Sequence, residues 1–245
     1  GKTTVTLGLI NAFARKRSVQ PFKSGPDYID SKFQSVAADR PSYNLDTWAM
    51  SSSDILNMIG MVGPSDICIA EGSMGLFDGV ISKGAGGNGS TADLASITNW
   101  PVILVVDCAK QAQSVAALIT GFNSFRHDIT IGGVILNNIS SKRHEALVVS
   151  EVSKTKVPIL GVIPRSNELT IPERHLGLVQ AEDLSDLEQL IFKLGTLIEE
   201  NCDLEAIACT ARNSFPPIST LQKITPPAQR IAIARDNAFT FTYSH

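Results

Sequence analysis

The sequence predicts an α/β fold built on a doubly wound, mostly parallel sheet. Apolar runs that do not alternate with polar residues recur along the chain, as expected for parallel strands covered by helices on both faces. Segments with helical spacing lie between these runs, and this alternation is typical of doubly wound sheets. The first residues, Gly1-Lys2-Thr3-Thr4, match the second half of a phosphate-binding loop, which indicates a P-loop fold.

The first element is a helix directly after Thr4, because Val5, Leu9 and Phe13 recur at helical spacing. The expected strands are residues 19–22, 67–70, 102–106, 134–136 and 159–163. The expected crossover helices are residues 93–97, 113–125 and 143–153. A P-loop follows a core strand, so residues 1–210 are interpreted as a domain that lacks its first strand, near the centre of its sheet.

Helix starts are marked by two capping boxes. Ser90 and Asp93 form one ahead of residues 93–97, and Ser185 and Glu188 form another ahead of an amphipathic helix over residues 187–198. The glycine-rich stretch Gly84–Gly89 predicts a mobile loop at the active edge.

The composition changes after Thr210. Pro216-Pro217 and Pro226-Pro227 bracket a stretch with little periodicity, so residues 211–229 are expected to be a linker. The run Ile231–Ala234 then predicts a new buried strand, and residues 230–245 are expected to begin a second α/β domain.

Composition and charge exclude several classes of function. With 43% hydrophobic and 18% charged residues, the 245-residue chain has the composition of a globular protein with a substantial core. A net charge of −3 without a basic stripe argues against nucleic acid or membrane partners. The longest apolar run, Val102–Val106, is too short to span a bilayer. The four cysteines form no CxxC pair, which predicts a reducing, cytoplasmic setting without a structural metal.

Lys2 and Thr3 are the first candidates for chemistry. In a phosphate loop, backbone N–H groups hold phosphate, the lysine reaches the β- and γ-phosphates, and the hydroxyl binds Mg²⁺. A polar helix start is the alternative reading. Glu71, at the end of the apolar run 67–70, would place a carboxylate at the sheet edge where ligands bind, although it could also be an ordinary solvent-exposed residue. Asp78 follows in the same loop.

Two further segments follow apolar runs. Lys23, Asp27 and Asp30 crowd a loop with a Gly-Pro turn, which suits a site that orients a carboxylate and a metal, or a simple polar loop. Asn137 ends the run 134–136 and could bind an adenine edge, although asparagine is also common in loops.

The chain resembles the cobyrinic acid a,c-diamide synthase family over essentially its whole length. The matching stretches, in family order, are KSGPDYID (23–30), NLDTW (44–48), EGSMGLFDG (71–79), STADLA (90–95), PVILVVD (101–107), GVILNN (133–138) and IPERHLGL (171–178). GPDYID together with PERHLGL is specific, whereas the phosphate loop alone is not. The family belongs to the dethiobiotin-synthetase-like branch of P-loop proteins and acts in cobalamin biosynthesis.

The resemblance implies that MgATP activates the a and c acetate groups of cobyrinic acid as acyl phosphates, and that ammonia from glutamine converts them to amides. It assigns ATP to Gly1, Lys2, Thr3, Thr4 and Asn137. It assigns Mg²⁺ to Thr3, Glu71 and Asp46, catalysis to Lys23, Asp27, Asp30 and Asp78, and corrin binding to Tyr28, Arg174 and His175.

The same resemblance implies a C-terminal glutamine amidotransferase domain, of which residues 230–245 would be the first strand. None of the four cysteines is assigned the role of its nucleophile. Residues 1–245 alone are expected to bind ATP weakly, because several phosphate-cradling N–H groups of the loop precede Gly1.

Alternative functions remain open at this point. Hydrogenobyrinic acid and nickel sirohydrochlorin present similar acetate groups, so the sequence does not separate these substrates. Dethiobiotin synthetase fits less well because of the expected extra domain. A ParA/MinD-like ATPase switch has no evident use for PERHLGL and GPDYID. The sequence also leaves the oligomeric state open, a homodimer included.

Overall fold

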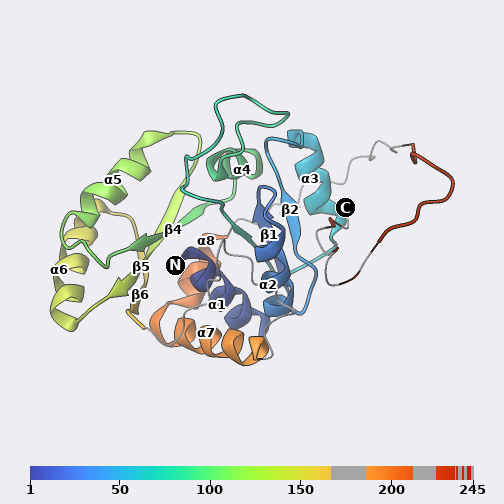
Figure 1. Cartoon of the computed structure of the whole chain (residues 1–245). Helices are drawn as coiled ribbons and strands as arrows, with labels where there is room; N and C mark the ends of the chain where they lie inside the picture. Colours follow the sequence, from blue (N-terminus) through green and yellow to red (C-terminus); the bar gives the residue numbers. More distant parts are fainter. Residues whose placement is uncertain (167–185, 212–224, 235, 237–238, 240–241, 244–245) are drawn as a thin grey trace.

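The computed structural model describes residues 1–166, 186–211, 225–234, 236, 239 and 242–243. Its described strands form two parallel half-sheets (Figure 1). The first, in the order β2-β1-β3, contains β1 (Val19–Ser24), β2 (Tyr43–Leu45) and β3 (Ile67–Glu71). The second, in the order β4-β5-β6, contains β4 (Val102–Asp107), β5 (Ile131–Ile139) and β6 (Ile159–Pro164). All four strand pairings are parallel, so the predicted parallel α/β fold is confirmed.

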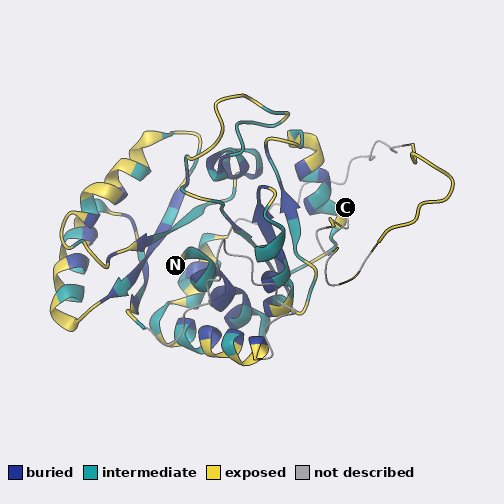
Figure 2. Ribbon diagram, viewed as in Figure 1, coloured by how far each residue is buried: buried dark blue, intermediate teal, exposed yellow. Residues whose placement is uncertain are grey.

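Helices cover both half-sheets. One hydrophobic cluster joins α1 (Lys2–Ala14), α2 (Tyr28–Ala38), α7 (Leu187–Asn201) and α8 (Leu204–Thr210) to the strands. A second lies beneath α5 (Val115–Phe125) and α6 (Lys142–Val152), and a third beneath α3 (Ser52–Met61) and α4 (Thr91–Thr98). Residues 153–155 add a 3₁₀ turn. Figure 2 shows buried residues along the strands and exposed ones on the outer sides of α5, α6 and α7.

Most expected helices are present near their predicted bounds. Ser90 caps α4 as predicted, since its hydroxyl accepts a hydrogen bond from Asp93 N at 3.2 Å. Residues 113–125 and 143–153 correspond to α5 and α6. The amphipathic pattern at 187–198 corresponds to α7, whereas Ser185 of its predicted capping box lies outside the described residues.

The predicted loop at residues 23–30 is shorter than expected, because β1 continues to Ser24 and α2 begins at Tyr28. Asp27 is the N-cap of α2, and its Oδ1 accepts hydrogen bonds from Ile29 N and Asp30 N at 3.1 and 3.2 Å. These two amides would otherwise lack partners, because the first N–H groups of a helix have no acceptor within it. Asp27 therefore has a structural role in addition to any chemical one.

The glycine-rich stretch Gly84–Gly89, predicted to be a mobile loop, forms backbone hydrogen bonds with its surroundings. Ala85 N donates to Trp48 O at 2.8 Å, and Gly86 N donates to Thr47 O at 2.9 Å. Its glycines permit this close approach of two backbones because they carry no Cβ.

The expected buried strand at 231–234 is not formed. Ile231 and Ile233 are 60% and 71% exposed, and no strand includes them. An apolar run becomes a strand only when a neighbour pairs with it, and none of the described residues does so. The predicted linker falls mostly on residues 212–224, outside the described part. Within the described residues, no helix is long and apolar enough to cross a membrane.

Candidate active site at the edge of the first half-sheet

A buried lysine surrounded by carboxylates lies at the end of β1. Lys23 is 2% exposed, and register places it between Asn44 of β2 and Glu71 of β3. Its Nζ forms a hydrogen-bonded ion pair with Asp30, and lies 3.5 Å from Glu71 Oε1 and 3.6 Å from Asp27 Oδ2. Neighbouring parallel strands end at the same edge, which is why residues distant in sequence meet here.

Glu71 links this cluster to the start of α1. Thr3 Oγ1 donates a hydrogen bond to Glu71 Oε1 at 2.6 Å, and Gln34 Nε2 donates to Glu71 Oε2 at 2.8 Å. Both Glu71 and Gln34 are buried. Ser42 Oγ in turn donates to Gln34 Oε1 at 2.8 Å, which fixes the orientation of the amide. The carboxylate of Glu71 is therefore held from both sides.

Burial and the neighbouring charges shift the pKa values of Lys2, Lys23 and Asp30. Burial and the neighbouring charge of Glu71 raise the pKa of Asp30 to about 6, although Lys23 opposes the shift. Burial alone would lower the pKa of Lys23, but Glu71, Asp30 and Asp27 outweigh it and raise this pKa. Burial lowers the pKa of Lys2. The site thus combines a firmly charged lysine with a carboxyl group that titrates near neutral pH.

Lys2, at the start of α1, reaches the loop after β3, and Asp78 belongs to that loop. Lys2 Nζ donates to Met74 O at 3.0 Å, and Gly75 N donates to Asp78 Oδ2 at 2.8 Å. Asp78 is exposed and closes the turn over residues 75–78. Gly1, the N-cap of α1, donates from its terminal amine to Thr4 Oγ1 at 3.2 Å. The start of α1 therefore faces this loop.

Asp46 lies beyond the end of β2, where its Oδ1 accepts hydrogen bonds from Trp48 N and Ala49 N at 2.9 and 3.3 Å. Thr3 and Glu71 offer a hydroxyl and a carboxylate oxygen side by side, the oxygen donors that Mg²⁺ prefers. These two residues fit a magnesium site. No contact among the described residues joins Asp46 to them, and no described cluster of three His, Cys, Asp or Glu side chains could hold a metal. The metal role of Asp46 stays a prediction.

Tyr28 is the first residue of α2, and its ring meets that of Tyr243 edge-on with centroids 6.0 Å apart. The hydroxyl of Tyr243 donates to Pro26 O, so a residue near the end of the chain lies against the Gly-Pro turn. Arg174 and His175 lie outside the described residues.

At the end of β5, two adjacent asparagines have different environments. Asn137 is 7% exposed and pairs through its backbone with Asp107 and Cys108 of the β4 side. Asn138 has a φ of 60°, and its Nδ2 donates to Asp107 Oδ1 at 2.9 Å, which lowers the pKa of Asp107. The Asp107–Asn138 pair was not predicted from the sequence.

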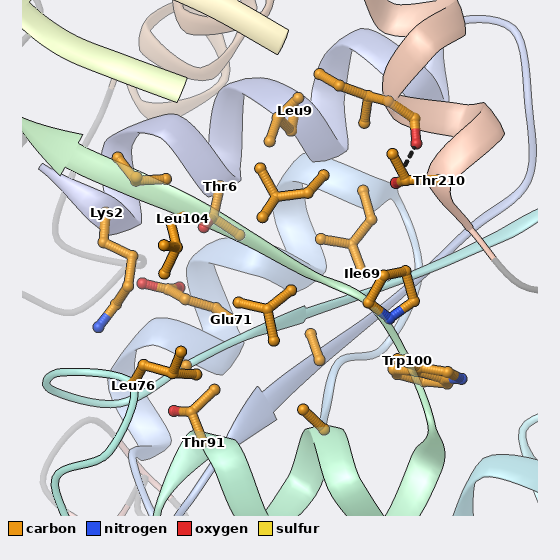
Figure 3. A pocket seen from close by; sticks show the side chains of 18 of the residues that line it. Lys2, Thr6, Leu9, Ile69, Glu71, Leu76, Thr91, Trp100, Leu104 and Thr210 are labelled. Atoms are coloured by element: carbon orange, nitrogen blue, oxygen red, sulfur yellow. Dashed lines mark hydrogen bonds between the residues drawn. The ribbon is translucent and has the colours of Figure 1, made fainter. Parts of the chain in front are cut away.

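A cavity of about 480 Å³ separates β3 from β4 and opens toward Lys2 and Glu71 (Figure 3). Its walls are mostly apolar and come from α1, α4 and the two strands, with Leu9, Ile69 and Leu104 among them. In Figure 3 the residues Ile69 to Glu71 and Trp100 to Leu104 run in the same direction across the view. The cavity is therefore an apolar slot between two parallel half-sheets, with charged groups at one end.

Gln34 is the principal residue that the sequence reasoning missed. Asp30 and Gln34 are four residues apart, so they share one face of α2. That spacing is a usable signal, since it places an amide beside a candidate catalytic carboxylate.

Comparisons with known proteins identify the family and the sequence relatives of this chain. The sequence model of the family described as "CobQ/CobB/MinD/ParA nucleotide binding domain" matches residues 1–179. The chain is 45% identical over 246 residues to hydrogenobyrinate a,c-diamide synthase of Rhodobacter capsulatus, and 43% identical over 250 residues to that of Brucella anthropi. Both matches cover 100% of this chain and 56% of the relative, so the chain spans about half the length of these proteins.

Among solved structures, the MinD cell division protein of Aquifex aeolicus matches with a TM-score of 0.44 and 16% identity, covering 86% of this chain and 89% of that one. Chloroplast FtsY of Physcomitrella patens matches with a TM-score of 0.45 and 15% identity, covering 78% of this chain and 61% of that one.

Proposed function

Because the chain belongs to the CobQ/CobB/MinD/ParA nucleotide-binding domain family, we propose that it is the carboxylate-activating domain of an a,c-diamide synthase in cobalamin biosynthesis. The names of its relatives favour hydrogenobyrinic acid as the substrate, with cobyrinic acid and nickel sirohydrochlorin as alternatives. The activity would belong to the whole protein, of which this chain is about half when compared with those relatives.

The observation that carries the proposal is the junction of Lys23, Glu71 and Thr3 at the start of α1. A helix N-terminus with a lysine at its first turn attracts phosphate. Lys2 would contact the γ-phosphate of ATP, and Lys23 would offer a second buried cation to the substrate carboxylate. Phosphoryl transfer depends chiefly on positioning and on neutralising charge, which two lysines at one edge can supply.

The proposed reaction has two steps. A carboxylate oxygen of the substrate attacks the γ-phosphorus of ATP, the bond to the bridging oxygen breaks, and ADP leaves. The nitrogen of ammonia then attacks the acyl carbon, the bond to phosphate breaks, and the nitrogen loses one proton. Bound Mg²⁺ would neutralise charge on the phosphates, and Thr3 and Glu71 would hold it.

Asp30 is the residue best suited to accept that proton. Its pKa of about 6 lies close to neutral pH, where a general base works most efficiently. Asp27 and Asp78 would orient the acetate arm or the ammonia, and Tyr28, Arg174 and His175 would contact the tetrapyrrole. Asn137 would contact the adenine. These roles come from the family resemblance and remain proposals.

Glutamine is the proposed source of ammonia, through an amidotransferase domain that residues 230–245 would begin, joined by a linker at 211–229. In the same proposal, the first strand that residues 1–210 are expected to lack would fill the slot between β3 and β4. It would join the two half-sheets into one. The size and apolar walls of that cavity support this arrangement.

The test supplies the whole protein with MgATP, ammonia and hydrogenobyrinic acid, and follows the tetrapyrrole by mass spectrometry. Added ammonia makes glutaminase activity unnecessary. We expect a monoamide followed by a diamide, both abolished by Lys2→Ala and preserved in Lys16→Ala, a matched change at an exposed lysine. ATP hydrolysis without amidation of any of the three tetrapyrroles would favour the ParA/MinD-like switch. Amidation that persists in Lys2→Ala would contradict the proposed site.

A further inference from the structure

At the carboxyl edge of the first half-sheet, the glycine-rich stretch 84–89 is hydrogen-bonded to the turn after β2, and we call these two segments the frame. Backbone hydrogen bonds tie the glycine-rich stretch 84–89 to the turn that follows β2, as in the bond from Ala85 N to Trp48 O at 2.8 Å. A Cβ added at Gly84 would lie 1.9 Å from Trp48 O, and one added at Gly86 would lie 2.6 Å from Met50 O. The two backbones are therefore in direct contact.

Three apolar side chains in and beside this frame are exposed to solvent. Trp48, Val80 and Ile81 are 49%, 51% and 106% exposed, and we call them the rim patch. Val80 N donates to Asn88 O at 2.8 Å, and the Cβ position of Gly89 lies 3.5 Å from Trp48 Cβ. Residues 88 and 89 thus link the backbone of Val80 to Trp48.

The rim patch borders the candidate active site. Trp48 lies two residues beyond Asp46, and Val80 lies two residues beyond Asp78. The same loop after β3 supplies Met74 O, the acceptor for Lys2 Nζ. A large ligand whose reactive group reaches Lys2 and Lys23 would pass over this edge.

We propose that the rim patch binds one face of the tetrapyrrole macrocycle and thereby presents an acetate arm to Lys2 and Lys23. The proposal rests on the proposed function and deepens it. A tetrapyrrole is broad and apolar on its faces and carries carboxylates around its edge. Trp48 would offer an aromatic surface to a face, Val80 and Ile81 would extend it, and Lys83, an exposed cation two residues after Ile81, would pair with a peripheral carboxylate.

The construction of the patch favours a small-molecule occupant. Three side chains expose far less than the roughly 800 Å² per partner that a stable protein interface buries, so a second copy of the chain fits poorly. A preorganised frame loses little conformational entropy on binding, which favours a ligand that must be held in one orientation.

The experiment uses tryptophan fluorescence. The chain has two tryptophans, so Trp100→Phe leaves Trp48 as the sole emitter, and hydrogenobyrinic acid, which absorbs light, is titrated into it. We expect saturable quenching. Ile81→Ser should weaken binding roughly tenfold through lost apolar contact. Met61→Ser, a change at another exposed apolar residue, at the far end of α3, should leave the Kd unchanged.

Several outcomes would overturn the proposal. Equal Kd values for Ile81→Ser and the parent protein, or binding without quenching of Trp48, would place the macrocycle elsewhere. Sedimentation that shows a dimer broken by Ile81→Ser would assign the patch to a second copy. In either case, amidation with added ammonia that still depends on Lys2 would leave the proposed function intact, so the two failures are distinguishable.

Discussion

Gln34 Nε2 donates a hydrogen bond to Glu71 Oε2 at 2.8 Å, and both side chains are buried. Thr3 occupies the other carboxylate oxygen. The Gln34 amide therefore fixes the orientation of the Glu71 carboxylate, so that Oε1 faces the start of α1. A buried carboxylate that keeps one fixed partner retains its orientation when the other partner is exchanged for a ligand.

Replacing Gln34 by leucine should destabilise the fold. The change keeps the volume but leaves Glu71 Oε2 without its buried donor, and hydrogen bonds to charged groups contribute about 1.5–3 kcal/mol. We expect a loss of that size in urea unfolding. Gln189→Leu, on the exposed side of α7, is the matched control and should change stability by less than about 0.5 kcal/mol. Equal effects of the two changes would argue against the role of Gln34.

Asp30 should give the chain a characteristic pH dependence. Its pKa rises from 3.8 to about 6 in the folded state, so between these values the folded state binds more protons than the unfolded state. The contribution of Asp30 to stability is therefore present below pH 4 and is lost as the pH rises through 6. The slope for one proton is at most about 1.4 kcal/mol per pH unit.

Urea unfolding from pH 4 to 7 measures this slope. Asp30→Asn removes the titrating group and should flatten the curve in that window. Asp39→Asn, at an exposed C-cap in the left-handed region that asparagine tolerates, should leave the slope unchanged. A curve for Asp30→Asn that parallels the parent protein would show that another group titrates there.

Much of the sheet was predictable because its strands are continuously apolar. β4 begins with five consecutive apolar residues, Val102–Val106, and such runs carry a strong signal. β2 was missed because Tyr43–Leu45 is too short to show any period. The strand expected at Ile231 failed for the opposite reason, since its local pattern is strong but pairing requires a neighbour.

Some parts of the site could not be predicted, because they depend on strand register and backbone conformation, which no sequence pattern indicates. Lys23 and Glu71 were predicted as separate candidates, and the register of β1 with β3 brings them together. Asn137 and Asn138 are indistinguishable in sequence, but the left-handed φ of 60° at Asn138 interrupts the regular strand there, and no sequence pattern predicts it. The structure joins Asn138 to Asp107 and buries Asn137.

Gly84 offers a direct test of the rigid frame. A methyl group there would meet Trp48 O, a backbone atom that cannot turn aside, so Gly84→Ala should destabilise by about 1–3 kcal/mol. Gly121 lies in α5, where an added Cβ meets nothing within 4 Å. Gly121→Ala should therefore be neutral or stabilise by up to about 1 kcal/mol through helix propensity. Thermal unfolding of both variants compares them, and a harmless Gly84→Ala would show that the frame yields.

The slot between β3 and β4 leads to the last prediction. Among the described strands, β3 pairs with β1 alone and β4 with β5 alone, so each has a free side that faces the cavity. Placing six or seven alternating Val and Ile residues, followed by a short glycine-rich loop, ahead of Gly1 should supply a strand for that slot, because the walls are apolar and α1 starts at its mouth.

Hydrogen exchange of the amides in β3 and β4 is the measurement for this extension. We expect slower exchange in both strands, because a strand that fills the slot would pair with each of them. An extension of equal length made of Ser and Asp is the control, since its side chains would be costly to bury between Leu9 and Leu104. Protection confined to one strand would mean that the segment binds at an edge. Unchanged exchange in both strands would refute the proposal that the two half-sheets are parts of one sheet.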